Sequence, residues 1–288
     1  MSKKVLLTGA NGQTGQTLIC SALADSCELL AVSRADLDIT DADAVLQLLA
    51  SIKPDVIINA AAYTAVDAAE NNADVAFAIN AGGPENLARG ARIHGCHLIH
   101  LSTDFVFDGS KNLPYTPADK TDPLGVYGQS KLAGEQAVRR ILPEHSTIIR
   151  TAWLYSPYGS NFVKTMLRLM KEQDQLSVVD DQIGTPCSTL TLSACIMAAV
   201  EKRISGIFHC SDGGLASWYD FAVAIQEEAL LIGLLDFAIP INPIPTSAYP
   251  TPARRPIYSV LDKQATVAAL GCGQQHWRLA LRDVLKNF

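Results

Sequence analysis

The chain has 288 residues, of which 48% are hydrophobic and 18% charged, and its formal net charge is -6. Such a chain can bury a large core and suits one large α/β unit or two closely joined domains. The negative charge and the lack of a basic run argue against nucleic acid as a partner. No uninterrupted apolar stretch reaches membrane-spanning length, so we expect no membrane partner and a cytoplasmic location.

Apolar strands and helices are predicted to alternate through the first half of the chain. Strands are expected at residues 4–8, 28–32, 56–59, 97–101 and 147–149, and helices at 13–23, 42–51, 74–94 and 127–141. The strands are continuously apolar, which is typical of a parallel sheet covered by helices on both faces. We therefore predict an α/β fold with a Rossmann-type, doubly wound parallel sheet over residues 1–150.

The alternation loosens after residue 150. Helices are predicted at 162–172, 189–202 and 218–231, and six prolines lie between residues 240 and 256. Helices and central strands do not continue through so many prolines. We therefore assign residues 151–288 mainly to a smaller C-terminal lobe, with some helices or strands packing back on the Rossmann sheet.

A glycine-rich turn follows the first predicted strand, with the sequence Gly9-Ala10-Asn11-Gly12-Gln13-Thr14-Gly15. Gly9 permits a tight turn, Gly12 lets the backbone approach a pyrophosphate, and Gly15 lets the helix pack near the sheet. Free amide groups at the start of the helix favour an anion. We expect the turn, with Asn11, Gln13 and Thr14, to bind the phosphates of a dinucleotide, which makes residues 1–150 an NAD(P)-binding domain.

The end of the second strand bears on cofactor choice. An NAD-specific dehydrogenase usually carries an acidic residue there, whereas this chain has Ser33 and Arg34. The Arg34 guanidinium can pair with a 2′-phosphate, so NADPH is the preferred donor and NADH the alternative. A solvated loop arginine is an equally open interpretation, because Asp36 and Asp38 lie nearby. Asp38 and Ile39 could instead line the adenine pocket.

Small residues follow the third predicted strand, where a ribose could pass close to the backbone. They form the segment Ala60, Ala61, Ala62, Tyr63 and Thr64. We expect this segment to lie beside the nicotinamide ribose.

Tyr127 and Lys131 are four residues apart on a predicted helix and so share one face. An ammonium group near the phenol is expected to lower the pKa of Tyr127 and make it a usable acid. Lys131 can also hold the ribose hydroxyls. Thr103, at the end of the fourth strand, can donate a hydrogen bond to a substrate carbonyl. This pattern indicates a nicotinamide-dependent reductase.

Together these residues resemble the extended short-chain dehydrogenase/reductases, and longer stretches narrow the resemblance to the dTDP-4-dehydrorhamnose reductases. The stretches are residues 59–67, 102–109, 123–135 and 245–256. The resemblance implies NAD(P)H-dependent reduction of the C4 ketone of dTDP-4-dehydro-L-rhamnose to dTDP-L-rhamnose, a precursor of bacterial surface polysaccharides.

Carried over by position, the resemblance implies that Thr103, Tyr127 and Lys131 are catalytic. It implies that Asp104 contacts the substrate and that Trp153 lines the sugar site. Arg254 or Arg255 is expected to meet the diphosphate bidentately.

The chain departs from the family at one point. Some members form a magnesium-bridged dimer through glutamates, and Thr17 and Leu190 stand at those positions here. Neither can ligate magnesium as a carboxylate does. We therefore expect no metal site, and a monomer or a homodimer.

Two other functions stay open. One is reduction of another 4-keto nucleotide sugar, and the other is a non-enzymatic role like that of the regulatory subunit of methionine adenosyltransferase. The intact Thr103, Tyr127 and Lys131 favour an enzyme. An epimerase would need an additional acid/base pair, and no such pair stands out.

Overall fold

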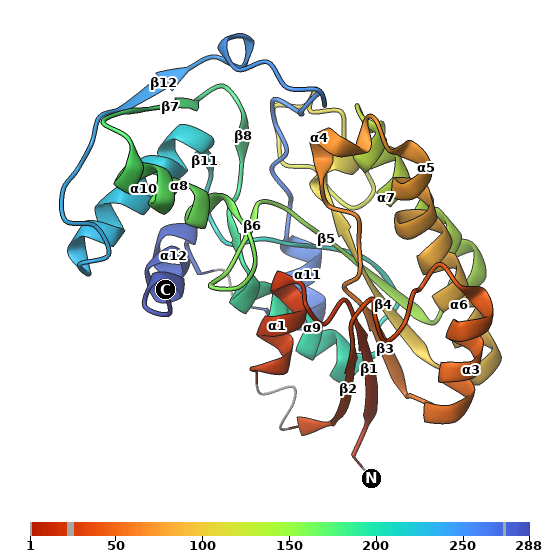
Figure 1. Ribbon diagram of the computed structural model, residues 1–288. Coiled ribbons are helices and arrows are strands. Elements are labelled where there is room, and N and C mark those ends of the chain that lie inside the picture. Colours follow the sequence, from red (N-terminus) through yellow and green to blue (C-terminus); the bar gives the residue numbers. More distant parts are fainter. Residues whose placement is uncertain (1, 22–25, 273–274) are drawn as a thin grey trace.

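The computed structural model describes residues 2–21, 26–272 and 275–288 (Figure 1). Its central sheet is six-stranded, with the order β10-β5-β4-β3-β1-β2 and parallel pairing throughout. The strands are β1 (Lys4–Thr8), β2 (Glu28–Val32), β3 (Val56–Asn59), β4 (His97–Thr103), β5 (Ser146–Thr151) and β10 (Gly206–Cys210). The predicted Rossmann-type α/β fold is confirmed.

Helices cover both faces of this sheet. One face carries α3 (Ala42–Ile52), α6 (Gly83–His94) and α7 (Val126–Ile141), and the other carries α1 (Gln13–Ile19), α9 (Thr189–Lys202) and α11 (Gln264–Leu270). Successive residues of β1 enter opposite cores: Leu6 packs beneath α3 and α6, whereas Val5 and Leu7 pack beneath α9. Because both faces are covered, the central positions Val5, Leu6 and Leu7 are all apolar.

The helix predicted at residues 74–94 is not continuous, so that prediction is wrong. The structure has α5 (Ala73–Phe77), a π-helical segment η1 (Ala78–Gly82), and then α6. Pro84 lies in the first turn of α6, where its missing N–H group is tolerated. The wider π turn carries Asn80, whose side chain bonds outside the helix; π segments often mark functional sites. The helix predicted at 13–23 ends at Ile19, and its last predicted residues fall in 22–25, outside the described residues.

The C-terminal part has its own core. It is built by α8 (Phe162–Glu172), α10 (Trp218–Leu231) and α12 (Trp277–Leu285), next to the paired strands β7 (Leu176–Val179) and β12 (Ile241–Ile244). Shorter strands are β6 (Leu154–Tyr155), β8 (Ile183–Gly184), β9 (Cys187–Ser188) and β11 (Ala216–Ser217). The Rossmann sheet also includes elements that follow residue 150: β10 is its edge strand, and α9 and α11 pack on one of its faces.

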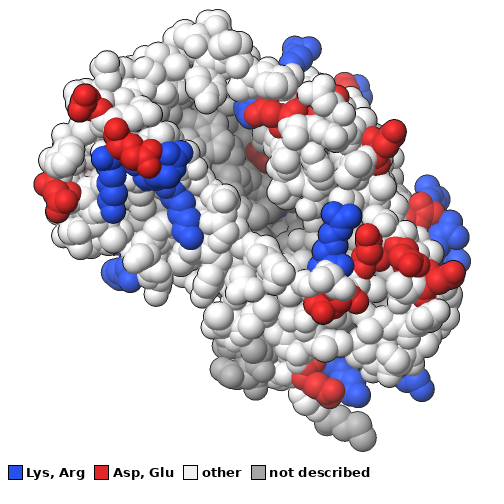
Figure 2. Space-filling model, in the orientation of Figure 1, with Lys and Arg blue, Asp and Glu red and all other residues white. Residues whose placement is uncertain are grey.

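A hollow separates the part that carries β7, β8 and β12 from the part that carries α4 (Val66–Ala69) and α5 (Figures 1 and 2). β2 and β3 lie on either side of β1: the chain passes from β1 to β2 on one side and then returns to β3 on the other, so the direction of strand addition reverses at β1. Ligands of open α/β sheets bind at such a switch point, beyond the carboxyl ends of the strands.

Among the residues that the structure describes, no helix is long and apolar enough to cross a membrane.

Candidate active site

The glycine turn lies at this switch point and is closed against the loop that follows β3. Gly9 has a φ of +77°, and a Cβ there would come within 2.6 Å of the Ala60 carbonyl carbon and the Ala61 nitrogen. A Cβ at Gly15 would overlap the Gly9 carbonyl oxygen. The Gly12 N–H donates to that same oxygen over 3.0 Å. The cradle therefore exists only because side chains are absent, and it fits the close approach of a dinucleotide pyrophosphate.

The other residues of the turn have different environments. Asn11 is exposed, whereas Thr14 is buried at the start of α1. The Gln13 side chain accepts hydrogen bonds from Ser156 Oγ (3.1 Å) and Asn161 Nδ2 (3.0 Å). Gln13 thereby joins the glycine turn to the C-terminal part of the chain.

The loop after β2 holds its polar side chains by local bonds. The Ser33 backbone and hydroxyl both donate to Asp36, at 2.8 and 2.7 Å. Arg34 is exposed and lies 3.7 Å from Asp38, whose carboxylate also accepts from Thr40. An exposed pair at this distance contributes little stability, so Arg34 is able to turn toward another anion. Ile39 is buried in the core beneath Gly83.

The loop from Ala60 to Thr64 is held by a residue that the sequence interpretation missed. Asn80 Oδ1 accepts from the Tyr63 N–H (2.8 Å), and its Nδ2 donates to the Tyr63 carbonyl and to Ser130 Oγ, each over 3.0 Å. Ser130 in turn donates to the Tyr127 carbonyl over 2.8 Å. This fully buried amide joins the loop to the first turn of α7. An asparagine inside an apolar helical run was the available signal.

Thr103 and Tyr127 are brought together by β4 and α7. The Thr103 hydroxyl is close enough to the Tyr127 phenol to favour its ionised form and so to lower its pKa. The Thr103 hydroxyl donates to Asp104 Oδ1 over 3.0 Å and accepts from the Phe105 N–H. The edge of the Phe105 ring meets Tyr127 at 5.7 Å between centroids. Three of the residues expected at the reaction centre are thus in one chain of contacts.

Lys131 lies beneath Tyr127 on the same face of α7. Its Nζ donates to the Leu101 carbonyl over 2.6 Å, and burial lowers its pKa to about 8. The nearby His100 is fully buried, and burial together with the Lys131 charge holds its pKa well below the usual value. His100 is therefore neutral at neutral pH.

The expected effect of Lys131 on the Tyr127 phenol is wrong for this arrangement. The pKa of Tyr127 is raised to about 12, first by burial and further by the charge of Asp104, although the neighbouring Thr103 hydroxyl opposes the rise. The spacing of four residues predicts a shared face correctly. Spacing does not predict desolvation, which dominates here.

Trp153 has a φ of +44° and stacks on Trp218, with 3.6 Å between ring centroids and 8° between planes. Gly184 packs closely against the Trp153 ring, because a Cβ added at Gly184 would come within 2.6 Å of that ring. Trp218 Nε1 donates to Gln182 over 3.2 Å, and its ring also packs on Phe162. Trp153 is thus held by a second aromatic residue that the sequence interpretation did not single out.

The two candidate arginines have different environments. Arg255 is bound bidentately by Asp67 at the start of α4, through Nη1–Oδ1 at 3.1 Å and Nη2–Oδ2 at 2.8 Å. Arg254 is exposed and has no ion pair within the described parts of the chain. Arg254 is therefore the arginine whose guanidinium is available to a ligand.

The chain is similar to known proteins over nearly its full length. The family model described as RmlD substrate binding domain matches residues 3–288. A dTDP-4-dehydrorhamnose reductase from Aggregatibacter actinomycetemcomitans is 43% identical, over 98% of this chain and 98% of its own length. The crystal structure of a dTDP-4-dehydrorhamnose reductase from Clostridium acetobutylicum has a TM-score of 0.92 and 40% identity, over 98% of both chains. The structure of the Bacillus anthracis dTDP-4-dehydrorhamnose reductase in complex with NADP has a TM-score of 0.94 and 36% identity, over 100% of both chains. This chain therefore belongs to the dTDP-4-dehydrorhamnose reductase family.

Proposed function

We propose that this chain reduces the C4 ketone of dTDP-4-dehydro-L-rhamnose to dTDP-L-rhamnose with NADPH, as a step in dTDP-rhamnose and surface polysaccharide biosynthesis. One observation carries the proposal: Thr103 and Tyr127 adjoin each other at the carboxyl end of β4, Lys131 is fixed there by the Leu101 carbonyl, and a side-chain-free glycine turn lies at the switch point of the same sheet. Full-length membership of the reductase family supports it. When bound, NADPH supplies the hydride.

Tyr127 is the proposed proton donor to the ketone oxygen. A phenol with a pKa of about 12 is fully protonated at neutral pH. An alkoxide forming at C4 is a much stronger base than a phenolate, so the proton moves downhill from Tyr127 to the sugar. Lys131, buried and fixed by the Leu101 carbonyl, is placed to stabilise the phenolate and hold the ribose hydroxyls.

Thr103 is proposed to orient the acid and the ketone. Its proton points to Asp104 Oδ1, so donation to the ketone requires rotation of the hydroxyl group. Asp104 then remains beside the substrate as an acceptor for a sugar hydroxyl. Trp153, held flat by Trp218, offers an apolar face to the sugar ring.

The proposed anion contacts of the substrate and the cofactor come from two exposed arginines. Arg254 is assigned to the diphosphate because Arg255 is already held by Asp67. Arg34 is assigned to the 2′-phosphate of NADPH, which would displace its weak contact with Asp38. We expect Arg34→Ala to lower kcat/KM for NADPH at least about tenfold and to leave the NADH value nearly unchanged.

The decisive experiment follows NADPH absorbance with purified protein and dTDP-4-dehydro-L-rhamnose. Turnover is expected with the wild-type chain, and Tyr127→Phe should lower kcat by about 10²–10⁴-fold because the donated proton is lost. Tyr219→Phe is the control, since this tyrosine packs against the core of the C-terminal part instead. Lack of oxidation of either nicotinamide would refute the reductase, and full activity of Tyr127→Phe would refute the assigned acid.

A further inference from the structure

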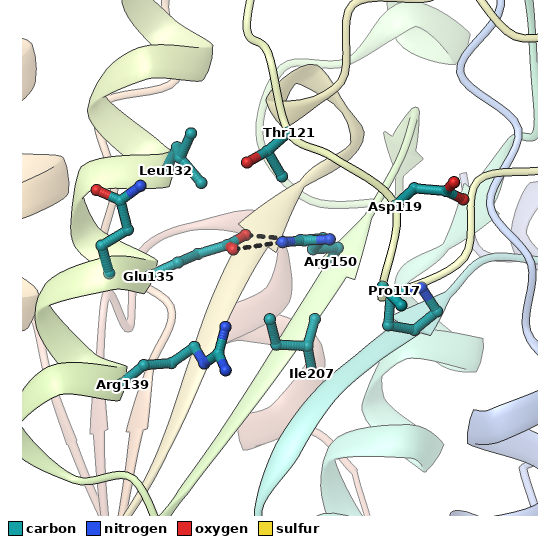
Figure 3. A pocket seen from close by; sticks show the side chains of 10 residues that line it. Pro117, Asp119, Thr121, Leu132, Glu135, Arg139, Arg150 and Ile207 are labelled. Atoms are coloured by element: carbon teal, nitrogen blue, oxygen red, sulfur yellow. Dashed lines mark hydrogen bonds and ion pairs between the residues drawn. The ribbon is translucent and has the colours of Figure 1, made fainter.

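A cavity lies beside α7, outside the site described above. Its volume is about 590 Å³, within the usual range for a small-molecule site. Four residues of α7 line it at the spacing of one helix face, and the other walls come from β5, β10 and the loop at 117–121 (Figure 3). The lining residues are Pro117, Ala118, Asp119, Thr121, Leu132, Glu135, Gln136, Arg139, Arg150 and Ile207. None of them belongs to the proposed reductase site.

Arg150 and Glu135 form a buried ion pair in the wall of this cavity (Figure 3). Nε donates to Oε1 over 2.9 Å and Nη2 donates to Oε2 over 2.7 Å, and the side chains are only 3% and 2% exposed. Both carboxylate oxygens are thus used by Arg150. The ion pair has no net charge. One guanidinium nitrogen of Arg150, Nη1, takes no part in it.

That remaining nitrogen, Arg150 Nη1, has no hydrogen-bond acceptor in the described part of the chain. The Phe107 ring lies 5.1 Å from Cζ and offers a π face, which favours the charge but does not replace an oxygen acceptor. A buried donor without an acceptor destabilises the folded state. Such a group in a folded protein calls for an explanation, and an acceptor from a bound molecule is one.

The charges at the mouth favour an anion. Arg139 is exposed and has no ion pair in the ranges that the structure describes, whereas its neighbour Arg140 lies 3.6 Å from Glu85. The carboxylate of Asp119 is held by Lys111 over 2.7 Å, so its charge is compensated. With the Glu135 charge cancelled by Arg150, Arg139 remains as the uncompensated charge of the lining.

The rest of the lining is divided between hydrogen-bonding and apolar groups. Thr121 and Gln136 contribute a hydroxyl and an amide. Leu132, Ile207 and Pro117 contribute apolar walls. A ligand that is charged at one end and apolar at the other matches this division.

We propose that the cavity binds a small organic anion, whose carboxylate or phosphate group is held by Arg139 and Arg150 while its apolar portion packs on Leu132 and Ile207. A guanidinium group suits both kinds of oxyanion: Arg139 can donate two parallel hydrogen bonds, and Arg150 has Nη1 left to donate. The site shares no residue with the cofactor cradle or with Thr103, Tyr127 and Lys131, so a negative result here leaves the proposed reductase function standing.

The test measures the binding of benzoate and phenyl phosphate by titration calorimetry, on the full chain with and without saturating NADPH. These probes share an apolar ring and differ in the oxyanion, so together they show which group the site takes. Arg139→Gln should weaken binding of the preferred probe by about tenfold or more. Arg140→Gln is the matched control and should change the affinity less than twofold.

A second variant keeps the proposal testable without touching the buried pair. Arg150 is not substituted, because its loss would leave Glu135 buried and uncompensated. Gln136→Trp is used instead, since this exposed residue of α7 lines the cavity and a larger side chain there obstructs it; it should abolish the binding that Arg139→Gln weakens. No binding of either probe, equal effects of the two arginine variants, or unchanged binding to Gln136→Trp would each overturn the proposal.

Discussion

The hydroxyl group of Thr103 donates a hydrogen bond to Oδ1 of Asp104 over 3.0 Å, where β4 ends and the 3₁₀ turn η2 (Asp104–Val106) begins. Asp104 is 1% exposed, and burial raises its pKa to about 6, although the neighbouring Ser259 and Thr103 hydroxyls oppose the rise. Its charge also raises the pKa of Tyr127. The ionisation of Asp104 is therefore coupled to the acid proposed for the reaction.

Asp104→Asn should shift the pH profile of the reductase. The neutral amide removes a negative charge beside the phenol, so the phenolate is less disfavoured and the pKa of Tyr127 falls. The basic limb of kcat/KM should move to lower pH, and any limb near pH 6 that belongs to Asp104 should vanish. Asp108→Asn is the control, because that carboxylate bonds Tyr115 and Ser110 instead. A basic limb that stays in place would contradict the coupling.

Gly15→Ala should damage the cofactor cradle. Its methyl group would overlap the Gly9 carbonyl oxygen, and the backbone must shift to relieve the clash, at a cost of about 1–3 kcal/mol. Urea unfolding and NADPH titration should show lower stability and weaker binding. Gly82→Ala is the matched control, since a Cβ there meets nothing within 4 Å and its φ of -60° is helical; that change should be neutral or slightly stabilising. Equal losses in both variants would refute the steric argument.

Arg254→Gln and Arg255→Gln should have different effects. Loss of Arg254 should raise KM for the dTDP-sugar about tenfold or more with little change in stability, because its guanidinium bonds no carboxylate in the described chain. Loss of Arg255 breaks the bidentate pair with Asp67 and should lower the free energy of unfolding by about 1 kcal/mol. Steady-state kinetics and chemical denaturation distinguish the two. The assignment fails if Arg255→Gln alone raises KM and stability is unchanged.

Glu228 should make stability depend on acid pH. Its carboxylate, 1% exposed, accepts from Arg282 at 2.7 and 3.0 Å and from Arg278 at 2.9 Å, and these bonds lower its pKa from 4.5 to about 2. A depressed carboxyl pKa stabilises the folded state above the unfolded pKa, and this stability is lost as pH falls from about 4.5 to 2.

Glu228→Gln should therefore lower the free energy of unfolding at pH 7 by about 1 kcal/mol, since the two arginines are partly exposed. The difference from the wild-type chain should disappear as the pH approaches 2, and urea unfolding at several pH values measures it. Glu227→Gln serves as the control, because Glu227 is half exposed and pairs only at the surface with Arg278. A difference that persists undiminished at low pH would disprove the linkage.

Local patterns in the sequence predicted the Rossmann-type sheet and much of the candidate site. Continuous apolar runs predicted the strands because a parallel sheet buries both faces, as Val5 and Leu6 do in opposite cores. The spacing of Gly9, Gly12 and Gly15 predicted a cradle that side chains would fill. Apolar runs and glycine spacing can be recognised in the sequence because they depend only on residues that are close together along the chain.

Other features depend on contacts between distant segments, which no local pattern reveals. Asn80 interrupts a predicted helix because its amide is satisfied by Tyr63 and Ser130. Arg255 differs from Arg254 mainly through its ion pair with Asp67, which lies 188 residues away.

The sequence by itself determined that Tyr127 and Lys131 share a helix face and that a glycine turn follows the first strand, because helical and glycine spacing follow from covalent geometry. Only the tertiary structure decided the electrostatic state of that pair. Burial raises the pKa of Tyr127 to about 12 and lowers that of Lys131 to about 8. Desolvation arises from atoms that β4, α7 and the loops bring together in space, and the order of residues along the chain does not encode it locally.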